Sequence, residues 1–316
     1  MLVLSGLTMG TSYSVKIPNA KIPLPQAKLA ENIEHVLHTI NMQLSTYIET
    51  SDISRFNQST TTNWFSISVE FYTVIKEALR IKQISNDAFD ITIGNLINLW
   101  GFGANTQTQH VLDQAMIDAV LSASGAKYIE LRASPYAIKK NNPDLMLDLS
   151  AIAKGFAVDC ISDHLDKLGV KNYIIEIGGE IKTKGRNSEN QDWRIGIESP
   201  ITHQRKIQMM IGLQDIGMAT SGDYRNYFTT NSVRYSHIIH PKTGKPVTHE
   251  LTSVTVLHPS TMTADAMATA ILVLGPEKGL ALAYQENIAA LLIARKGDDF
   301  MQTMTPQFKQ VILQNP

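Results

Sequence analysis

Residues 147–180 read LDLSAIAKGFAVDCISDHLDKLGVKNYIIEIGGE, and the fold depends on the turn from strand to helix in this stretch. An apolar segment ends on Asp148, which predicts a buried strand, and Ser150 is a residue type that caps helices. A helix is therefore expected over residues 150–168. A carboxylate, a helix N-terminus and Lys154 thus fall within seven residues of one another, a combination typical of sites that bind a phosphate and its metal.

The composition is that of an ordinary globular protein. The chain has 316 residues, 43% hydrophobic and 18% charged, with a formal net charge of -1. Scattered Lys and Arg residues argue against a nucleic-acid groove or a polybasic membrane patch. No apolar run approaches the roughly 18 residues needed to span a bilayer. The single cysteine, Cys160, excludes an internal disulfide and is expected to be a buried structural thiol.

The apolar periodicity predicts helices and strands that do not alternate simply. An amphipathic helix is expected to start near Pro25, with further helices over residues 69–84, 113–124, 150–168, 263–274 and 276–285. Strands are expected over residues 12–17, 173–177, 193–198, 207–213, 236–239, 251–256 and 288–294, with loops over 105–110 and 185–192. This pattern predicts a mixed α/β chain of the α+β type rather than βαβ units. Gly101-Phe102-Gly103 lacks the third glycine of a dinucleotide fingerprint, so a Rossmann fold is rejected.

The first candidate constellation joins Asp148, the Ser150 helix start and Lys154. A buried carboxylate is costly unless it has a partner, and the helix N-terminus and Lys154 favour a bound anion. The alternative is a capping network beside a surface lysine.

The second constellation is Asp265 with Thr269, in TMTADAMAT at residues 261–269. Residues four apart share one face of a helix, and a carboxylate and a hydroxyl are hard ligands that suit Mg²⁺. The alternative is a tightly packed helix that carries a partly buried aspartate.

The third constellation is YSHIIHPKTG at residues 235–244. His237 and His240 are three apart and would face opposite sides of a strand, so they are a poor metal pair. Either could act as a general base near neutral pH, and the alternative is a structural histidine.

Taken together, the motifs resemble those of the ApbE family of FAD:protein FMN transferases. The matching motifs span nearly the whole chain in the family's order: residues 8–11 (TMGT), 44–47 (LSTY), 51–57 (SDISRFN), 88–94 (AFDITIG), 98–103 (NLWGFG), 147–159, 177–180 (IGGE), 220–222 (TSG), 236–244 and 263–275. The resemblance implies an ApbE-like fold, with mixed sheets flanked by helices, over residues 1–316 as one domain or two intimate subdomains. One departure is His240, where the family usually has Asp or Asn before the proline.

The resemblance also implies the site residues. The residues that fall on the family's FAD contacts are Met9, Tyr47, Ala88, Phe89, Asp90, Asp148, Lys154 and Ile239. The backbone carbonyl of Ala151, with Asp265 and Thr269, falls where the family holds its metal. His237 falls on the family's candidate catalytic histidine.

The activity that the resemblance implies is Mg²⁺-dependent transfer of FMN from FAD to a threonine of an acceptor redox protein, with release of AMP. His237 or Asp148 would accept the threonine proton, and His237 is preferred because the intrinsic pKa of histidine lies near neutrality. The alternatives are an FAD pyrophosphatase that yields FMN and AMP, and a non-enzymatic flavin-binding protein.

Many family members are exported and held at the inner membrane by a lipid on an N-terminal cysteine. This chain lacks that cysteine and begins about where the family's mature domain begins. The expectation is therefore a periplasmic inner-membrane lipoprotein whose signal has been removed, with a cytoplasmic protein as the alternative.

Overall fold

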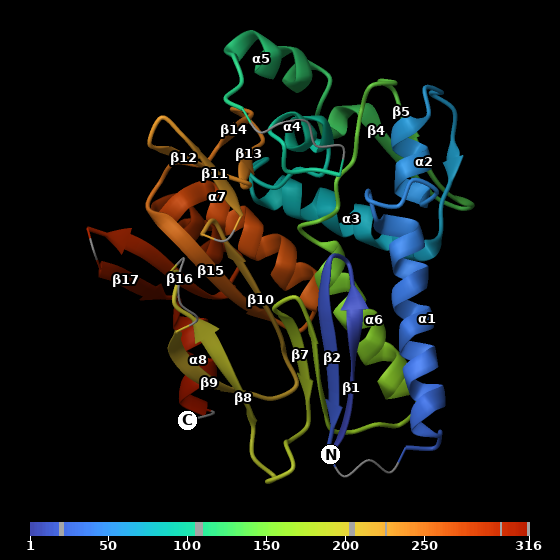
Figure 1. Cartoon of the computed structure of the whole chain (residues 1–316), viewed down its shortest axis with the longest axis vertical. Helices are drawn as coiled ribbons and strands as arrows, with labels where there is room; N and C mark the ends of the chain where they lie inside the picture. Colours follow the sequence, from blue (N-terminus) through green and yellow to red (C-terminus); the bar gives the residue numbers. More distant parts are fainter. Residues whose placement is uncertain (19–21, 105–109, 202–205, 225, 298, 315–316) are drawn as a thin grey trace. The chain divides into compact units, whose positions relative to one another are not determined.

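The computed structural model (Figure 1) describes residues 1–18, 22–104, 110–201, 206–224, 226–297 and 299–314. These residues fall into two units. Unit 1 comprises Met1–Thr39, Ile152–Tyr224 and Glu250–Pro316, and unit 2 comprises Ile40–Ala151 and Arg225–His249. Most of the predicted loop at 105–110 lies outside the described residues.

An eight-stranded sheet forms the centre of unit 1. Its order is β1-β2-β6-β7-β10-β15-β16-β17. The strands are β1 (Leu2–Thr8), β2 (Thr11–Ile17), β6 (Tyr173–Ile177), β7 (Glu180–Lys184), β10 (Gly217–Gly222), β15 (Leu251–His258), β16 (Ala289–Lys296) and β17 (Asp299–Met304). Every ladder in it is antiparallel. The predicted α+β class is therefore confirmed, with antiparallel rather than mixed sheets.

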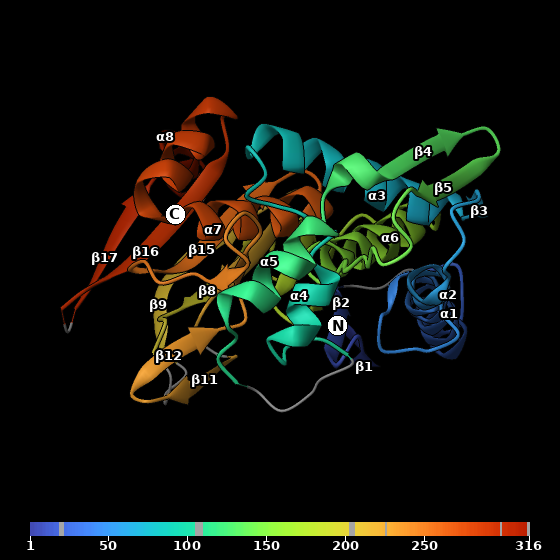
Figure 2. The same cartoon turned by 90° about the horizontal axis from the view of Figure 1, so that it is seen from above.

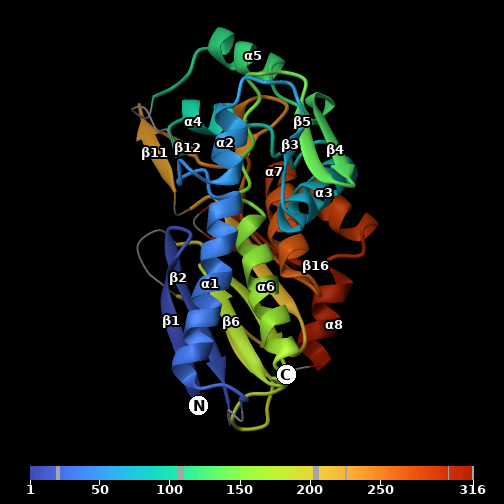
Figure 3. The same cartoon turned by 90° about the vertical axis from the view of Figure 1, so that its right-hand side faces the viewer.

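The two faces of this sheet carry different layers. The hairpin of β8 (Trp193–Glu198) and β9 (Ile207–Leu213) packs with α8 (Pro306–Gln314) on one face. Their shared core contains Trp193, Leu213, Leu291 and Phe308. Alternate residues of a strand point to opposite faces. On the other face α6 (Ala153–Lys167) packs against β6 and β7, and α7 (Thr261–Gln285) packs against β10 and β15. Figure 3 shows α6 beside β6.

Helix α7 is the one described helix long and apolar enough to span a bilayer by length and composition. Most of its side chains are buried within unit 1, as expected of a core helix. The prediction of two helices meeting at Gly275-Pro276 is confirmed as a kink, where Gly275 has a non-helical φ of 79°. Its start is Thr261 rather than residue 263, because Ser260 accepts the Thr263 N–H and Asp159 accepts those of Thr261 and Met262.

Among its described residues, unit 2 contains the end of α1 (Gln26–Leu44), four further short to medium helices and three small sheets. The helices are α2 (Asp52–Gln58), α3 (Val69–Ile84), α4 (Gly94–Leu99) and α5 (Gln114–Ser122), with a 3₁₀ turn at Ala126–Tyr128. The sheets are β3 (Phe65–Ser66) with β5 (Tyr136–Lys140) and β4 (Ile129–Ala133); β11 (Tyr227–Thr230) with β12 (Val233–Ser236); and β13 (Ile239–His240) with β14 (Lys245–Pro246). Figure 2 shows α3 beside the β4–β5 hairpin.

Two predictions around Asp148 are wrong. The helix starts at Ala153 rather than at Ser150, because Asp148 Oδ1 accepts the Ser150 N–H at 2.8 Å and closes a turn there. The preceding segment is not a strand: it pairs only through an isolated parallel bridge between Ile93 and Met146. Its alternating buried leucines mimic a strand pattern without a continuous ladder.

The strand predicted over residues 236–239 is also wrong. Strand β12 ends at Ser236 and β13 begins at Ile239, so His237 lies between two short strands. The argument that His237 and His240 oppose each other on one strand therefore does not apply.

Candidate functional site

The sequence-predicted site residues are divided between the two units, and each group is described within its own unit. Unit 1 holds Met9, Lys154, Asp265 and Thr269. Unit 2 holds Tyr47, Ala88, Phe89, Asp90, Asp148, Ala151, His237 and Ile239.

Three ionisable side chains of unit 1 form what we call the ionic cluster: Lys154, Glu180 and Asp265. Lys154 lies in the first turn of α6, Glu180 begins β7, and Asp265 lies near the start of α7. The Lys154 Nζ is 3.5 Å from Glu180 Oε1 and 3.8 Å from Asp265 Oδ2. Both carboxylate side chains are only 4% exposed, so each depends on partners inside the protein.

The environment of the cluster acts on both carboxyl groups. Burial raises the pKa of Glu180 and that of Asp265, and the Lys154 ammonium opposes the effect at each. The charge of Asp265 raises the pKa of Glu180 further. The Gly155 N–H donates to Asp265 Oδ2 at 3.0 Å and favours its ionised form. With both carboxyls ionised, the cluster carries a net negative charge and suits a cation.

The oxygen ligands predicted for Mg²⁺ are compatible with that ion. Thr269 lies one turn after Asp265 on α7, and its hydroxyl is 2.9 Å from that of Ser221 on β10. Carboxylate and hydroxyl oxygens are the ligand types that Mg²⁺ prefers, with waters and phosphates completing its shell. Ala151 is the last residue of unit 2 before Ile152. No group of three or more His, Cys, Asp or Glu that could hold a metal occurs among the described residues.

Helices α6 and α7 approach so closely at this site that only glycine fits at position 155. A Cβ on Gly155 would lie 2.3 Å from the Thr261 carbonyl oxygen and 2.8 Å from Asp265 Cβ. The nearest atom belongs to the backbone of α7, which cannot move aside as the end of a flexible side chain could.

Gly155→Ala is therefore expected to lower the free energy of unfolding by about 1–3 kcal/mol, since it forces α6 and α7 apart. Urea unfolding monitored by circular dichroism would measure the change. Gly196→Ala is the matched control, because its new Cβ would meet only side-chain atoms at 3.3 Å or more. Unfolding of Gly155→Ala at the wild-type midpoint would contradict the packing argument.

Met9 occupies a backbone conformation that methionine rarely adopts. Thr8 pairs with Thr11, so Met9 and Gly10 form a two-residue turn with φ values of 50° and 72°. Asn or Gly is the usual residue at the first of these positions, and non-glycine residues at positive φ are strained. The two-residue hairpin itself requires this conformation, and the contact of Met9 with FAD stays a prediction.

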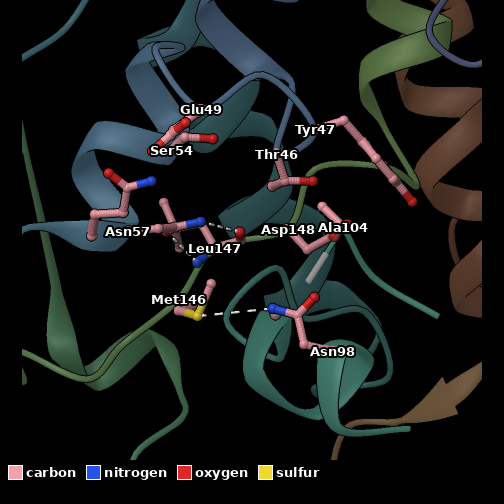
Figure 4. Close-up of a pocket in the computed structure, with 12 residues that line it drawn as sticks. Thr46, Tyr47, Glu49, Ser54, Asn57, Asn98, Ala104, Met146, Leu147 and Asp148 are labelled. Carbon is pink, nitrogen blue, oxygen red and sulfur yellow. Dashed lines mark hydrogen bonds between the residues drawn. The ribbon is translucent and has the colours of Figure 1, made fainter. Parts of the chain in front are cut away.

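A polar pocket of about 250 Å³ lies within unit 2 (Figure 4). Tyr47 and Asp148, two of the predicted FAD contacts, both line it. The other lining residues are Thr46, Glu49, Ser54, Asn57, Gln58, Gly94, Asn98, Ala104, Met146 and Leu147. Tyr47 is 70% exposed.

Asn57 holds the segment before Asp148 through two hydrogen bonds. Its Nδ2 donates to the Leu147 carbonyl at 2.9 Å, and its Oδ1 accepts the Leu147 N–H at 2.8 Å (Figure 4). The Asp148 N–H in turn donates to the Ile91 carbonyl at 2.8 Å. Three separate motifs, around residues 57, 91 and 148, are thereby joined at one wall of the pocket.

A buried lysine supports the same wall. Lys140 is fully buried, and its ammonium donates to the carbonyls of Asn57 and Leu145, each at 3.2 Å. Burial lowers the pKa of Lys140 to about 8, against a smaller opposing effect of Asp144.

Stability is therefore expected to rise with pH from about 8 toward 10. Below pH 8 both folded and unfolded chains hold the Lys140 proton, whereas above it the folded chain loses the proton first. The gain is at most about 3 kcal/mol, since the ordinary pKa is 10.5. Urea midpoints across this range should rise less in Lys140→Met than in the wild type, and Lys139→Met, at the partly exposed neighbouring lysine, is the control. Equal slopes in all three proteins would show that Lys140 does not titrate there.

The side chains of several predicted FAD contacts are buried in unit 2 or paired with neighbouring residues. Ala88, Phe89 and Ile239 are at most 4% exposed. The Asp90 carboxylate is 2.9 Å from the Lys82 ammonium and accepts the Thr92 N–H and hydroxyl. The side chains of Ala88, Phe89 and Ile239 thus lie in the core of unit 2 and that of Asp90 is engaged by Lys82 and Thr92, and their contact with FAD stays a prediction.

His237 follows β12 and is fixed by its neighbours. Its Nδ1 is 2.9 Å from the Asn226 carbonyl oxygen, and its ring meets that of Phe102 edge-on at 6.3 Å. A carbonyl only accepts, so this bond places a proton on Nδ1 and makes Nε2 the acceptor of the neutral ring.

His240 stabilises the turn that follows it. Its Nδ1 accepts the Lys242 N–H at 3.1 Å in the turn before Gly244. An Asp or Asn side chain makes the same bond at the start of such a turn. The departure from the family's usual residue therefore preserves the local geometry.

Two residues with evident structural roles received none in the sequence analysis. Glu180 and Asn57 each end a motif that was quoted for the resemblance. The spacing of the chain gave no signal that Glu180 would meet Lys154, or that Asn57 would bind a backbone 90 residues away.

Comparison with known proteins agrees with the resemblance. The model of the ApbE family matches residues 9–292. FAD:protein FMN transferase of Vibrio cholerae serotype O1 is 42% identical over 97% of this chain and 91% of its own length. The protein of the same name from Haemophilus influenzae is 41% identical over 98% of this chain and 91% of its own length.

Solved structures agree as well. The flavin transferase ApbE from Vibrio cholerae superposes with a TM-score of 0.91 at 41% identity, covering 98% of each chain. The apo form of the Pseudomonas stutzeri flavinyl transferase ApbE gives 0.90 at 37% identity, covering 98% of this chain and 96% of its own. The fold and the matched motifs are those of an ApbE-type flavin transferase. The chain belongs to the ApbE family.

Proposed function

We propose that this protein is an FAD:protein FMN transferase that uses Mg²⁺ to move FMN from FAD to a threonine hydroxyl of an acceptor protein. The observation that carries the proposal is the near full-length match to relatives of that name at up to 42% identity. The buried ionic cluster supports it, because it offers a cation site and a lysine for phosphate.

Each residue has a definite task in this reaction. Asp265, Thr269 and the Ala151 carbonyl would hold Mg²⁺, which supplies charge neutralisation at the diphosphate of FAD. Lys154 would pair with a phosphate oxygen, and the Met9 turn, Tyr47 and Asp148 would bind the flavin nucleotide. His237 Nε2 would accept the proton of the acceptor threonine.

The bonds and charges balance. The threonine oxygen forms a bond to the phosphorus on the FMN side of the diphosphate, and the bond from that phosphorus to the bridging oxygen breaks. AMP leaves with the bridging oxygen, and the threonine proton passes to His237. The products are an FMN phosphoester on the acceptor and free AMP.

The test is incubation of the protein with FAD, Mg²⁺ and a candidate acceptor domain, followed by mass spectrometry. An FMN adduct on an acceptor threonine with equal AMP is the expected result. AMP and free FMN without an adduct would instead indicate an FAD pyrophosphatase, and no AMP at all would indicate a flavin-binding protein. A threonine-to-alanine acceptor is the matched control.

We also propose that the protein acts in the periplasm at the inner membrane, where redox proteins in membrane-bound electron-transfer complexes would be its acceptors. The support is the family resemblance alone. Cell fractionation of the native source checks it, and recovery of the protein with cytoplasmic markers would favour the alternative.

A further inference from the structure

Glu180 has no role in the reaction as described so far, yet it is as deeply buried as the proposed metal ligand Asp265. The residue is 3% exposed, and its Oε1 is 3.5 Å from Lys154 Nζ. Its Oε2 is buried and has no hydrogen-bond partner among the described residues. A buried carboxyl oxygen without a hydrogen-bond partner costs free energy, so a function for it is expected.

The fold fixes Glu180 in this position. Ile177 pairs with Glu180 across a two-residue turn of Gly178 and Gly179, both with positive φ. A Cβ on Gly178 would lie 2.8 Å from the Thr11 side chain, so the turn packs closely on β2. Glu180 thus enters the cluster from a rigid hairpin rather than from a flexible loop.

The charges of the cluster explain why a second carboxylate is useful. With Asp265 alone, the Lys154 ammonium would neutralise the predicted metal ligand and repel a divalent cation. With Glu180 present, Lys154 is shared between two carboxylates at 3.5 and 3.8 Å. When Asp265 binds a cation, Lys154 keeps Glu180 as its anionic partner.

We propose that Glu180 is a positioning residue that holds Lys154 and supplies the negative charge by which Asp265 binds its divalent cation. This inference rests on the proposed function, since it takes Asp265 as the metal ligand. Glu180 acts through Lys154 and through the field at the site, not by contact with the reacting atoms.

The test uses the full chain without FAD and Mn²⁺ alone as the probe. Electron paramagnetic resonance of free Mn²⁺ gives the affinity of each variant. Glu180→Gln is expected to bind Mn²⁺ about 10-fold to 100-fold more weakly than the wild type, as removal of supporting partners does at other metal sites. Glu176→Gln, an exposed glutamate on the adjacent strand β6, should bind as the wild type does.

A second pair of variants separates charge from folding. Lys154→Gln removes the competing ammonium and is expected to bind Mn²⁺ at least as tightly as the wild type. The double variant Lys154→Gln/Glu180→Gln restores the net charge of the cluster, so its affinity should return toward the wild-type value. If Glu180→Gln does not fold, Lys154→Gln alone decides, and weaker binding there contradicts the proposal.

Two outcomes would overturn the inference: wild-type Mn²⁺ affinity in Glu180→Gln, or a loss in that variant which the double variant does not recover. Other results would show that the proposed function itself is wrong. In that case Asp265→Asn would bind Mn²⁺ normally, or the wild type would form neither an adduct nor AMP.

Discussion

Replacing Asp265 by asparagine is expected to reduce Mg²⁺-dependent FMN transfer by about 10³-fold or more while the chain stays folded. Metal neutralisation of phosphoryl charge is worth several kcal/mol, and each 1.4 kcal/mol is a factor of ten in rate. The asparagine Oδ1 can still accept the Gly155 N–H that now meets Asp265 Oδ2 at 3.0 Å. Lys154 keeps Glu180 as its partner, so the packing of α6 on α7 should persist.

The measurement is the rate of AMP release at saturating FAD over a range of Mg²⁺ concentrations, with thermal unfolding of the same preparation. Asp299→Asn, an exposed aspartate that begins β17, is the matched control and should show wild-type turnover. Retention of more than a tenth of wild-type activity by a folded Asp265→Asn protein would refute the metal assignment.

The fold of unit 1 could be predicted where sequence periodicity and burial agree. The strands β6, β8 and β9 have the predicted bounds because one face of each is apolar. Strand β7 was not predicted, because EIKTK at residues 180–184 carries polar residues that only the neighbouring strands explain. Strand β1 was missed because its solvent-facing residues are apolar: Leu7 is 88% exposed.

The site could be predicted in part. Sequence spacing could not predict that Lys154 and Asp265 lie close together in space, because 110 residues separate Gly155 from the Asp265 carboxylate that accepts its N–H. Family motifs nominated both residues but gave Glu180 no role, because a charge partner is defined only by the packing of α6, α7 and β7. The Ser150 cap was wrong for a local reason: the Asp148 side chain competes for the backbone and delays the helix by one turn.

Replacing His237 by asparagine is expected to reduce FMN transfer by about 10²-fold to 10⁴-fold, the usual contribution of a positioned general base. The substitution is chosen because the Asn Nδ2 can take the place of His Nδ1 and donate to the Asn226 carbonyl, now 2.9 Å away. What it removes is Nε2, the proposed proton acceptor. FAD affinity, measured by flavin fluorescence, and thermal stability should stay near their wild-type values, so the loss should appear in kcat.

His240→Asn is the matched control for this experiment. Its Oδ1 can accept the Lys242 N–H as His240 Nδ1 does at 3.1 Å, so the turn should survive and transfer should stay within about threefold of the wild type. Transfer by His237→Asn that remains within the same range would exclude His237 as the base. Asp148 would then be the residue to replace, because it lines the unit 2 pocket together with Tyr47. A loss in both histidine variants with lowered thermal stability would instead indicate that the segment between β12 and β14 serves the fold.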